Sequence, residues 1–252
     1  MPAASAPKKT RLDLLLVQRG LVESREKAQA LILAGQVDVG GHGAAKAGTM
    51  VPIDADIRVI GPDHPWVSRG GIKLAHALDT FGISATGATV LDVGASAGGF
   101  TDVWLQRGAR QVIALDVGHS QLHWKMRSDP RVTVIENTNA RHLKPGDLPD
   151  PGSPITRVSI DVSFISLRHI FPVLPALIAA ASEIVALVKP QFEAGRKDVG
   201  KGGLVHDPDV HARVVADVTT AAAEVGLKRV GLVDSPITGA EGNKEFLLHL
   251  RS

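Results

Sequence analysis

The residues best suited to chemistry lie in a glycine-rich turn between two apolar stretches. Residues 94–99 read Gly-Ala-Ser-Ala-Gly-Gly after the largely apolar residues 90–93, and Asp116 closes a second apolar stretch, 112–115. The order strand, glycine turn, helix, strand and acid is typical of a nucleotide-cofactor pocket in an α/β sheet, where the acid accepts hydrogen bonds from a ribose. The residues predicted to contact the cofactor are Gly94, Ala95, Ser96, Gly98, Gly99, Phe100 and Asp116.

The spacing within this turn favours one kind of cofactor. The dinucleotide fingerprint G-x-G-x-x-G is absent, because Ser96 stands where its second glycine would be. A nucleoside cofactor without phosphates fits the turn better than a dinucleotide does. We therefore predict S-adenosylmethionine.

Two other interpretations of the turn stay open. It could be a tight turn without a ligand. It also matches the G-x-S-x-G elbow of serine hydrolases, with Ser96 as the nucleophile of a hydrolase or a membrane-lytic protein. Asp116 favours a cofactor, since the elbow does not require an acid at that position.

Three ionisable residues stand at the ends of predicted strands. Asp161 closes the stretch from Ile155, Lys189 closes the stretch from Ile184, and Glu245 opens the stretch to Leu250. Parallel strands bring their carboxyl ends to one edge, and a final antiparallel strand begins at that edge, so the three side chains can converge beside the cofactor. The alternative is a helix cap, a solvated strand end and a surface acid.

The composition is that of a globular protein and excludes several classes. Hydrophobic residues at 44% and charged residues at 21% indicate neither a disordered nor a fibrous chain. The lack of cysteine excludes disulfides, thiolate zinc sites and a cysteine nucleophile, and we predict no metal site. The longest apolar run, 170–181, contains two prolines and is too short for a membrane helix. We expect a cytoplasmic protein with no membrane association and no obligate protein partner.

The chain divides into two expected domains joined by a proline-rich linker at 61–66. Residues 1–60 hold the small excess of positive charge and predict a small α+β domain after a flexible tail, 1–10, with Ser24 capping its second helix. Residues 67–252 alternate strands and helices, which predicts an α/β, mostly parallel Rossmann-like sheet with a closing antiparallel strand. The expected strands are 89–93, 111–116, 132–135, 155–161, 184–189, 228–233 and 245–250, and the expected helices are 67–81, 99–107, one after Asp161 through about Ala181, and 208–226.

Four motifs resemble the TlyA family of ribosomal RNA 2′-O-methyltransferases, whose members have often been called hemolysins. They are residues 66–74 (Trp-Val-Ser-Arg-Gly-Gly-Ile-Lys-Leu), 94–102, 160–166 and 187–193. The region from residue 67 onward is similar to the FtsJ-like, S-adenosylmethionine-dependent methyltransferases. Residues 1–60 resemble the RNA-binding domain of ribosomal protein S-four. The resemblance implies methylation of a ribose 2′-oxygen, with cytidine of ribosomal RNA or ribosomal subunits as the expected substrate. A methyltransferase with a small-molecule acceptor is the other alternative.

The resemblance also implies roles for single residues. Lys73, Asp161, Lys189 and Glu245 correspond to a catalytic Lys-Asp-Lys-Glu set, and Asn139 falls in a segment expected to touch the cofactor. We expect Lys189 to be the base, with Asp161 and Glu245 orienting it and Lys73 steadying the alkoxide.

The predicted contacts to RNA are basic side chains with one tryptophan. Such groups bind phosphates and fix register, whereas a scatter of Lys and Arg can equally be a solvated surface. Trp66 could stack on a base or pack between domains. The basic, glycine-rich loop 194–203 could close over RNA or be a surface loop. The candidates are Arg11, Arg19, Arg25, Lys27, Lys46, Trp66, Arg196 and Lys197.

Overall fold

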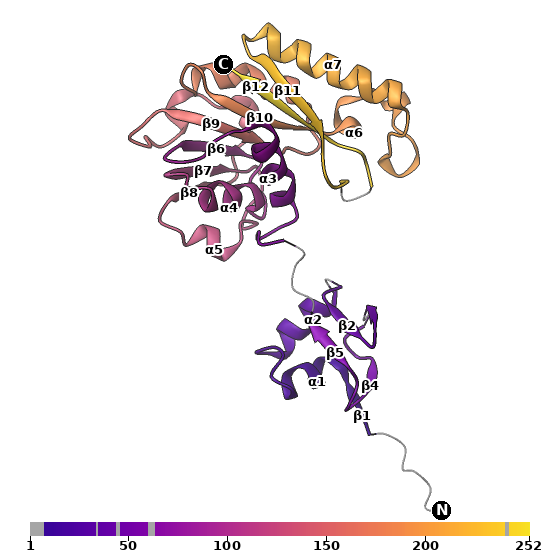
Figure 1. Cartoon of the computed structure of the whole chain (residues 1–252). Coiled ribbons are helices and arrows are strands. Elements are labelled where there is room, and N and C mark those ends of the chain that lie inside the picture. The colour runs from indigo at the N-terminus through magenta and orange to yellow at the C-terminus, as the bar shows by residue number, and fades with distance from the viewer. Residues whose placement is uncertain (1–7, 34, 44–45, 60–63, 240–241) are drawn as a thin grey trace, which may run out of the picture. The chain divides into compact units, whose positions relative to one another are not determined.

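The computed structural model describes residues 8–33, 35–43, 46–59, 64–239 and 242–252. The chain forms two compact units, residues 1–65 and 66–252, which are drawn in Figure 1.

The small unit packs two helices on short strands. Its core joins apolar residues of α1 (Leu12–Gln18) and α2 (Arg25–Leu33) to strand residues such as Val37 and Val51. The Ser24 Oγ atom accepts from the Lys27 backbone N at 3.2 Å, which is the geometry of the predicted cap. The strands are β1 (Lys9–Arg11) paired with β4 (Met50–Pro52), and β2 (Val37–Val39) between β3 (His42–Gly43) and β5 (Ile57–Val59).

Strand β1 corrects the expected flexible tail. Lys9 and Thr10, expected in the tail, pair with Pro52 and Val51 of β4 in an antiparallel ladder. The sequence gives little signal for a three-residue strand, because it depends on a partner about 40 residues away for its hydrogen bonds. Residues 1–7 lie outside the described part of the chain.

The large unit is built on a seven-stranded sheet in the order β11-β12-β10-β9-β6-β7-β8. The strand pairs are parallel except those of β12, which is antiparallel to both β10 and β11. This confirms the predicted α/β class and the closing antiparallel strand. The strands are β6 (Thr89–Val93), β7 (Gln111–Leu115), β8 (Val132–Ile135), β9 (Ile155–Ile160), β10 (Glu183–Val188), β11 (Lys228–Asp234) and β12 (Phe246–Arg251).

Helices cover both faces of this sheet (Figure 1). Alternate residues of β6 enter different cores. Val90 belongs to the core that includes residues of α3 (Gly70–Phe81) and α4 (Gly99–Gln106), whereas Leu91 belongs to the core that includes residues of α7 (Pro208–Glu224). This follows from the two-residue period of a strand, and it explains why β6 is buried throughout. In the described part of this unit, the two remaining α-helices, α5 (Trp124–Arg127) and α6 (Pro190–Glu193), are single turns.

The predicted helix between Asp161 and Ala181 was wrong. The segment forms two 3₁₀ turns, Leu167–His169 and Phe171–Ala176. Pro172 and Pro175 lack the backbone N–H that an α-helix interior needs, and their rings clash with the preceding turn. The apolar residues nevertheless pack on the sheet, since Leu167, Phe171 and Leu174 are buried.

The order of strands creates a crevice beside β6. The chain passes from β6 outward to β7 and β8, and β9 then pairs with the other side of β6. Ligands of open α/β sheets bind at such a switch point, outside the carboxyl ends of the strands. The glycine turn after β6 and Asp161 after β9 both lie there.

Candidate active site

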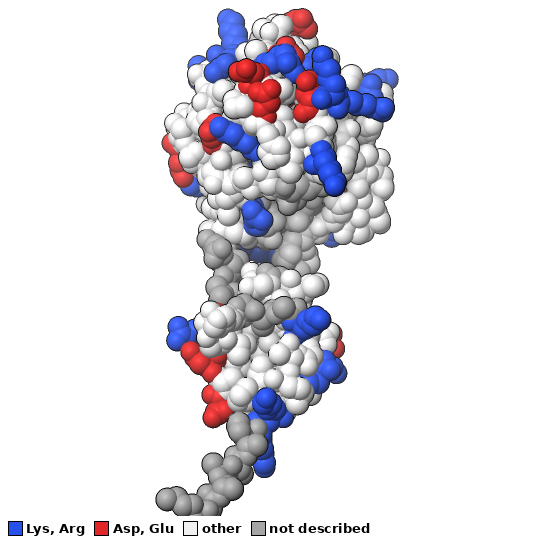
Figure 2. Space-filling model, turned by 90° about the vertical axis from the view of Figure 1, so that its right-hand side faces the viewer, with Lys and Arg blue, Asp and Glu red and all other residues white. Residues whose placement is uncertain are grey.

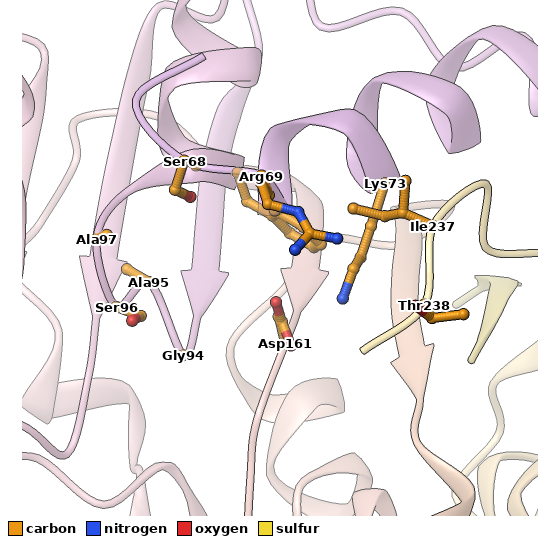
Figure 3. A pocket seen from close by; sticks show the side chains of 13 residues that line it. Ser68, Arg69, Lys73, Gly94, Ala95, Ser96, Ala97, Asp161, Ile237 and Thr238 are labelled. Atoms are coloured by element: carbon orange, nitrogen blue, oxygen red, sulfur yellow. The ribbon is translucent and has the colours of Figure 1, made fainter. Parts of the chain in front are cut away.

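Two neighbouring cavities open at this switch point. The larger has a volume of about 480 Å³ and the smaller about 250 Å³, and Gly94, Ser96 and Asp161 line both. The larger one extends along the ends of β7 and β8, past Asp116 and Asn139. The smaller one extends toward the start of α3, where Figure 3 shows Arg69, Lys73 and Asp161 pointing toward one another. A cavity of several hundred Å³ is the usual size of a small-molecule site.

The glycine turn between β6 and α4 needs its glycines because neighbouring segments leave no room for a Cβ atom. At Gly94, with φ of +82°, a Cβ would lie 2.4 Å from the backbone oxygen of Asp161. At Gly98, with φ of +92°, it would meet Leu122 and Met126 at 2.9 Å, and at Gly99 it would lie 2.2 Å from Ser68 Oγ. The turn therefore packs closely against three other segments, at Asp161, at Leu122 and Met126, and at Ser68, and its backbone lines the cavities.

Asp116 shapes the larger cavity with both of its carboxylate oxygens. Its Oδ2 accepts from the Ser96 backbone N at 2.8 Å, and its Oδ1 accepts from the Gly118 backbone N at 2.7 Å. Each carboxylate oxygen has a second lone pair, so the acid can still accept from a ribose. Asn139 lines the same cavity, and its Oδ1 accepts from the Arg141 backbone N at 3.1 Å.

The four residues of the Lys-Asp-Lys-Glu set form two ion pairs. Lys73 Nζ donates to Glu245 Oε2 at 2.5 Å, and both side chains are nearly buried. Lys189 Nζ lies 2.6 Å from Asp161 Oδ1 without hydrogen-bond geometry, and it donates to Ser163 Oγ at 3.0 Å. Glu245 therefore orients Lys73, which corrects the expectation that it orients Lys189. Lys73 comes from α3, a helix outside the sheet, so strand ends alone did not indicate this partner.

The loop after β9 is fastened to the loop after β10. Besides holding Ser163, the 189–193 segment supplies Glu193, whose two oxygens bind the start of the 3₁₀ turn at Leu167. Burial raises the pKa of Glu193, and these hydrogen bonds oppose the rise. The contacts between the two loops are Lys189–Asp161, Lys189–Ser163, Phe164–Phe192 (ring centroids 5.0 Å apart), Ser166 Oγ to Glu193 Oε2 (2.5 Å) and Leu167 N to Glu193 Oε1 (2.8 Å).

Sequence reasoning missed several residues that line the smaller cavity. Ser68 and Arg69 precede α3, and Ile237 and Thr238 lie between β11 and β12. None of them follows a parallel strand, which was the signal used to find candidates. The remaining signal was the Ser-Arg pair directly before Gly70-Gly71, because two glycines at the start of a helix indicate close packing there.

The structure offers the hydrolase interpretation little support. Ser96 has the strand-to-helix position and a positive φ of +46°, but its backbone N–H is bound to Asp116. Within the described ranges, no histidine hydrogen-bonds Ser96 Oγ, as a hydrolase triad would require. The same ranges contain no cluster of metal-binding side chains, and none of their helices is long and apolar enough to cross a membrane.

Three of the predicted RNA-binding arginines stabilise the small unit itself. Arg11 and Arg25 both bind the buried carboxylate of Asp13, each through a contact of 2.9 Å to Oδ2. Arg19 donates to the backbone oxygens of Ala55 (2.7 Å) and Ile53 (2.5 Å). Each of these guanidinium groups therefore has a role in the small unit that the charge pattern did not reveal.

The other predicted RNA contacts fall into two groups. Lys27 and Lys46 of the small unit, and Arg196 and Lys197 of the large one, are exposed. On the face that Figure 2 shows, basic side chains of the large unit stand among acidic ones, not in one stripe. Trp66 is half-buried and packs on α3, since a Cβ on Gly71 would lie 2.3 Å from its ring. Their contact with RNA stays a prediction.

Comparisons with known proteins agree for both units. The family of FtsJ-like methyltransferases matches residues 66–252, and the S4 domain matches residues 10–57. The protein YqxC of Bacillus subtilis is 51% identical over 96% of this chain and 86% of its own length. The 16S/23S rRNA (cytidine-2′-O)-methyltransferase TlyA of Mycobacterium tuberculosis is 46% identical over 97% of this chain and 91% of its own. A solved structure from Streptococcus thermophilus, described as a hemolysin, is 43% identical, covers 98% of this chain and 90% of its own, and has a TM-score of 0.76. The chain therefore belongs to the TlyA family, in which an S4 domain precedes an FtsJ-like methyltransferase domain.

Proposed function

We propose that this chain transfers a methyl group from S-adenosylmethionine to the 2′-oxygen of a cytidine in ribosomal RNA. The observation that carries the proposal is the position of two lysine–carboxylate pairs beside two adjoining cavities. Lys73 and Asp161, one member of each pair, line the smaller cavity, and the larger cavity shares Gly94, Ser96 and Asp161 with it and is also lined by Asp116. Ribose methylation needs these two parts side by side: a nucleoside-cofactor pocket, and groups that take a proton from a very weak acid.

The residues present fit S-adenosylmethionine. Asp116 and Asn139 in the larger cavity suit the adenosine hydroxyls and base, and the backbone of residues 94–99 suits the amino-acid end. When bound, this cofactor supplies an electrophilic methyl group on a positively charged sulfur. No phosphate-binding sequence is needed, in agreement with Ser96 in place of the second fingerprint glycine.

The proton acceptor in this proposal is Lys189, which Asp161 holds next to the wall shared by the two cavities. Lys189 Nζ is held by Asp161 and Ser163, and both of these residues line the larger cavity. Lys189 takes the 2′-hydroxyl proton, and Lys73, which lines the smaller cavity, steadies the developing alkoxide. Positioning contributes most, because holding oxygen and methyl carbon at about 3 Å can supply about 7–11 kcal/mol.

The small unit makes an RNA acceptor more fitting than a small molecule. An S4 domain covers residues 10–57, and the M. tuberculosis relative at 46% identity is named for cytidine of 16S and 23S rRNA. Lys27 and Lys46 are exposed cations that would bind phosphates. Such a substrate places the protein in the cytoplasm, where ribosomes are assembled.

Lys189→Ala tests this proposal. We expect methyl transfer from labelled S-adenosylmethionine to unmethylated ribosomal RNA to fall by about 100-fold to 10,000-fold, the usual contribution of a general base. Cofactor affinity, measured by calorimetry, should change little, and the exposed Lys228→Ala serves as the matched control. Mass spectrometry of the RNA product should show the mark on a ribose of cytidine. Turnover by Lys189→Ala close to that of Lys228→Ala would remove Lys189 from the role, and a wild-type chain that methylates no ribosomal RNA would contradict the proposed function.

A further inference from the structure

Trp124, the first residue of α5, is exposed beside the cofactor turn. Its side chain is 74% exposed, whereas Trp104 is fully buried and Trp66 is half-buried against Gly71. One exposed apolar side chain is ordinary on a protein surface, so the residues around Trp124 must indicate whether a partner binds there.

The turn that carries Trp124 is fixed to the glycine turn. Leu122 and Met126 lie against Gly98, at 2.9 Å from the position of a Cβ, and the His123 backbone N donates to the Ala97 oxygen at 3.2 Å. His123 Nδ1 in turn accepts from the Lys125 backbone N at 3.2 Å. The indole is thus held on a braced element, on the side of α5 away from Met126, which is 1% exposed.

The surface around Trp124 presents cations, and the acids that pair with them are covered. Lys125 is 52% exposed and Arg127 is 42% exposed, while their partners, Asp102 and Glu136, are 1% and 13% exposed. The histidine ring of residue 123 lies 5.9 Å from the indole. An aromatic platform among positive charges is the arrangement that binds single-stranded nucleic acid, because bases stack on the ring and phosphates meet the cations.

The same loop reaches the cofactor cavity. Val117 and Gln121, a few residues before Trp124, line the larger cavity, and Val117 is 69% exposed. A strand bound at Trp124 therefore lies next to a loop that lines the cofactor cavity.

We propose that Trp124 stacks on an unpaired base of the RNA substrate near the target nucleotide, with Lys125 and Arg127 meeting the adjoining phosphates. This inference rests on the proposed function. The stacked base fixes the RNA strand against the element that braces Gly98, so that substrate binding and the cofactor turn share one support.

The experiment compares Trp124→Ala and Trp124→Phe with Val230→Ala in the full chain. Val230 is a matched exposed apolar residue, 50% exposed on β11, at the sheet edge opposite to β8. The probes are a fluorescent 12-residue oligocytidylate for binding, unmethylated ribosomal RNA for turnover, and S-adenosylmethionine for calorimetry. We expect Trp124→Ala to weaken oligonucleotide binding and to raise KM for RNA by about 10-fold, the loss of one stacked base. Trp124→Phe should keep part of the affinity because it keeps a ring.

Three outcomes overturn the inference. Oligonucleotide affinity of Trp124→Ala equal to that of Val230→Ala shows that no base stacks there. A parallel loss of affinity for S-adenosylmethionine shows that the indole only supports the cofactor turn. A Trp124→Phe variant as weak as Trp124→Ala shows that the ring is not used for stacking. Failure of the wild-type chain to methylate ribosomal RNA refutes the proposed function instead. In that case the oligonucleotide affinities of the Trp124 variants still test whether a base stacks on Trp124.

Discussion

Gly94→Ala should disable the site through a contact inside the protein. The added Cβ would lie 2.4 Å from the backbone oxygen of Asp161, and neither backbone segment offers a flexible side chain that could move away. A carbon at this position needs about 3 Å, so the glycine turn and the start of the Asp161 loop must separate by about 0.6 Å or more. That separation moves Asp161, which lines both cavities, away from the turn.

The size of the effect follows from two separate costs. Alanine at a φ of +82° costs about 1–2 kcal/mol of backbone strain. Displacement of reacting groups by close to 1 Å can lower turnover by about 100-fold. The first cost lowers stability, and the second lowers cofactor affinity and turnover.

Gly87→Ala separates these two costs. Gly87 has a φ of +69°, lies before the same strand at its other end, and has nothing within 4 Å of its Cβ position. Both variants should lower the unfolding midpoint by about 2–8 °C. Only Gly94→Ala should lose affinity for S-adenosylmethionine by calorimetry and methyl transfer by about 10-fold to 100-fold. Equal affinity and turnover in the two variants would refute the argument from the Asp161 contact.

Two further predictions concern buried carboxylates and pH. Hydrogen bonds, the strongest from Arg11 and weaker ones from Gln29 and Arg25, hold the pKa of Asp13 well below its usual value of 3.8. The contribution of Asp13 to the free energy of unfolding is therefore complete above pH 3.8, and it is lost as the pH falls below that value. Asp13→Ala should destabilise the small unit by about 1–3 kcal/mol, because the arginines are partly exposed, and amide hydrogen exchange of residues 9–59 should show it with residues 66–252 unchanged. Burial, partly opposed by hydrogen bonds from Thr101 and Ser159, raises the pKa of Asp92 to about 6, so the native state is penalised as pH rises from 3.8 through 6, by about 3 kcal/mol at pH 7. Thermal unfolding between pH 5 and 7 should show a little under half of this loss, about 1 kcal/mol, in the wild type and a much flatter profile in Asp92→Asn. Equal profiles would contradict the assignment.

The layout of the large unit was predictable because its strands are buried on both faces. Largely apolar stretches such as 90–93 and 184–188 predict central strands, and the glycine turn and the acids then fall at the carboxyl ends of the strands. The segment 162–181 was not predictable by the same pattern, since its apolar residues pack on the sheet from 3₁₀ turns. The periodicity of apolar residues indicates which residues are buried, whereas the prolines determine that the backbone forms 3₁₀ turns instead of an α-helix.

The sequence did not predict that basic residues of the small unit form ion pairs within that unit. The sequence shows Arg11 and Arg25 as two cations near helix ends, and it also contains Asp13. Only folding brings both guanidinium groups to one carboxylate that is fully buried. The charge pattern could not distinguish arginines that bind RNA from arginines that form ion pairs within the small unit, because both roles use the same side chain.

The pairing within the Lys-Asp-Lys-Glu set shows which side-chain contacts strand register predicts and which it does not. Val188 of β10 pairs with Phe246 of β12, so continuing the ladder places Lys189 opposite Glu245. The expected Lys189–Glu245 contact follows from this register alone. Instead, the chain turns into α6 after Lys189, whose Nζ meets Asp161, and Lys73 from α3 takes Glu245. The position of α3 depends on packing that no strand pattern contains, namely Trp66 against Gly71 and Ser68 against Gly99.

This pairing has a consequence for the reaction. Two lysines and two carboxylates in two close pairs carry no net charge when all four are ionised, and each pair compensates its own desolvation. A lysine that is to accept a proton must first lose one, and its carboxylate then stands uncompensated at the cavity wall. For the Lys189 pair that carboxylate is Asp161, which lines both cavities, so the negative charge appears where a sulfonium would bind. A positively charged ligand in these cavities would compensate that carboxylate.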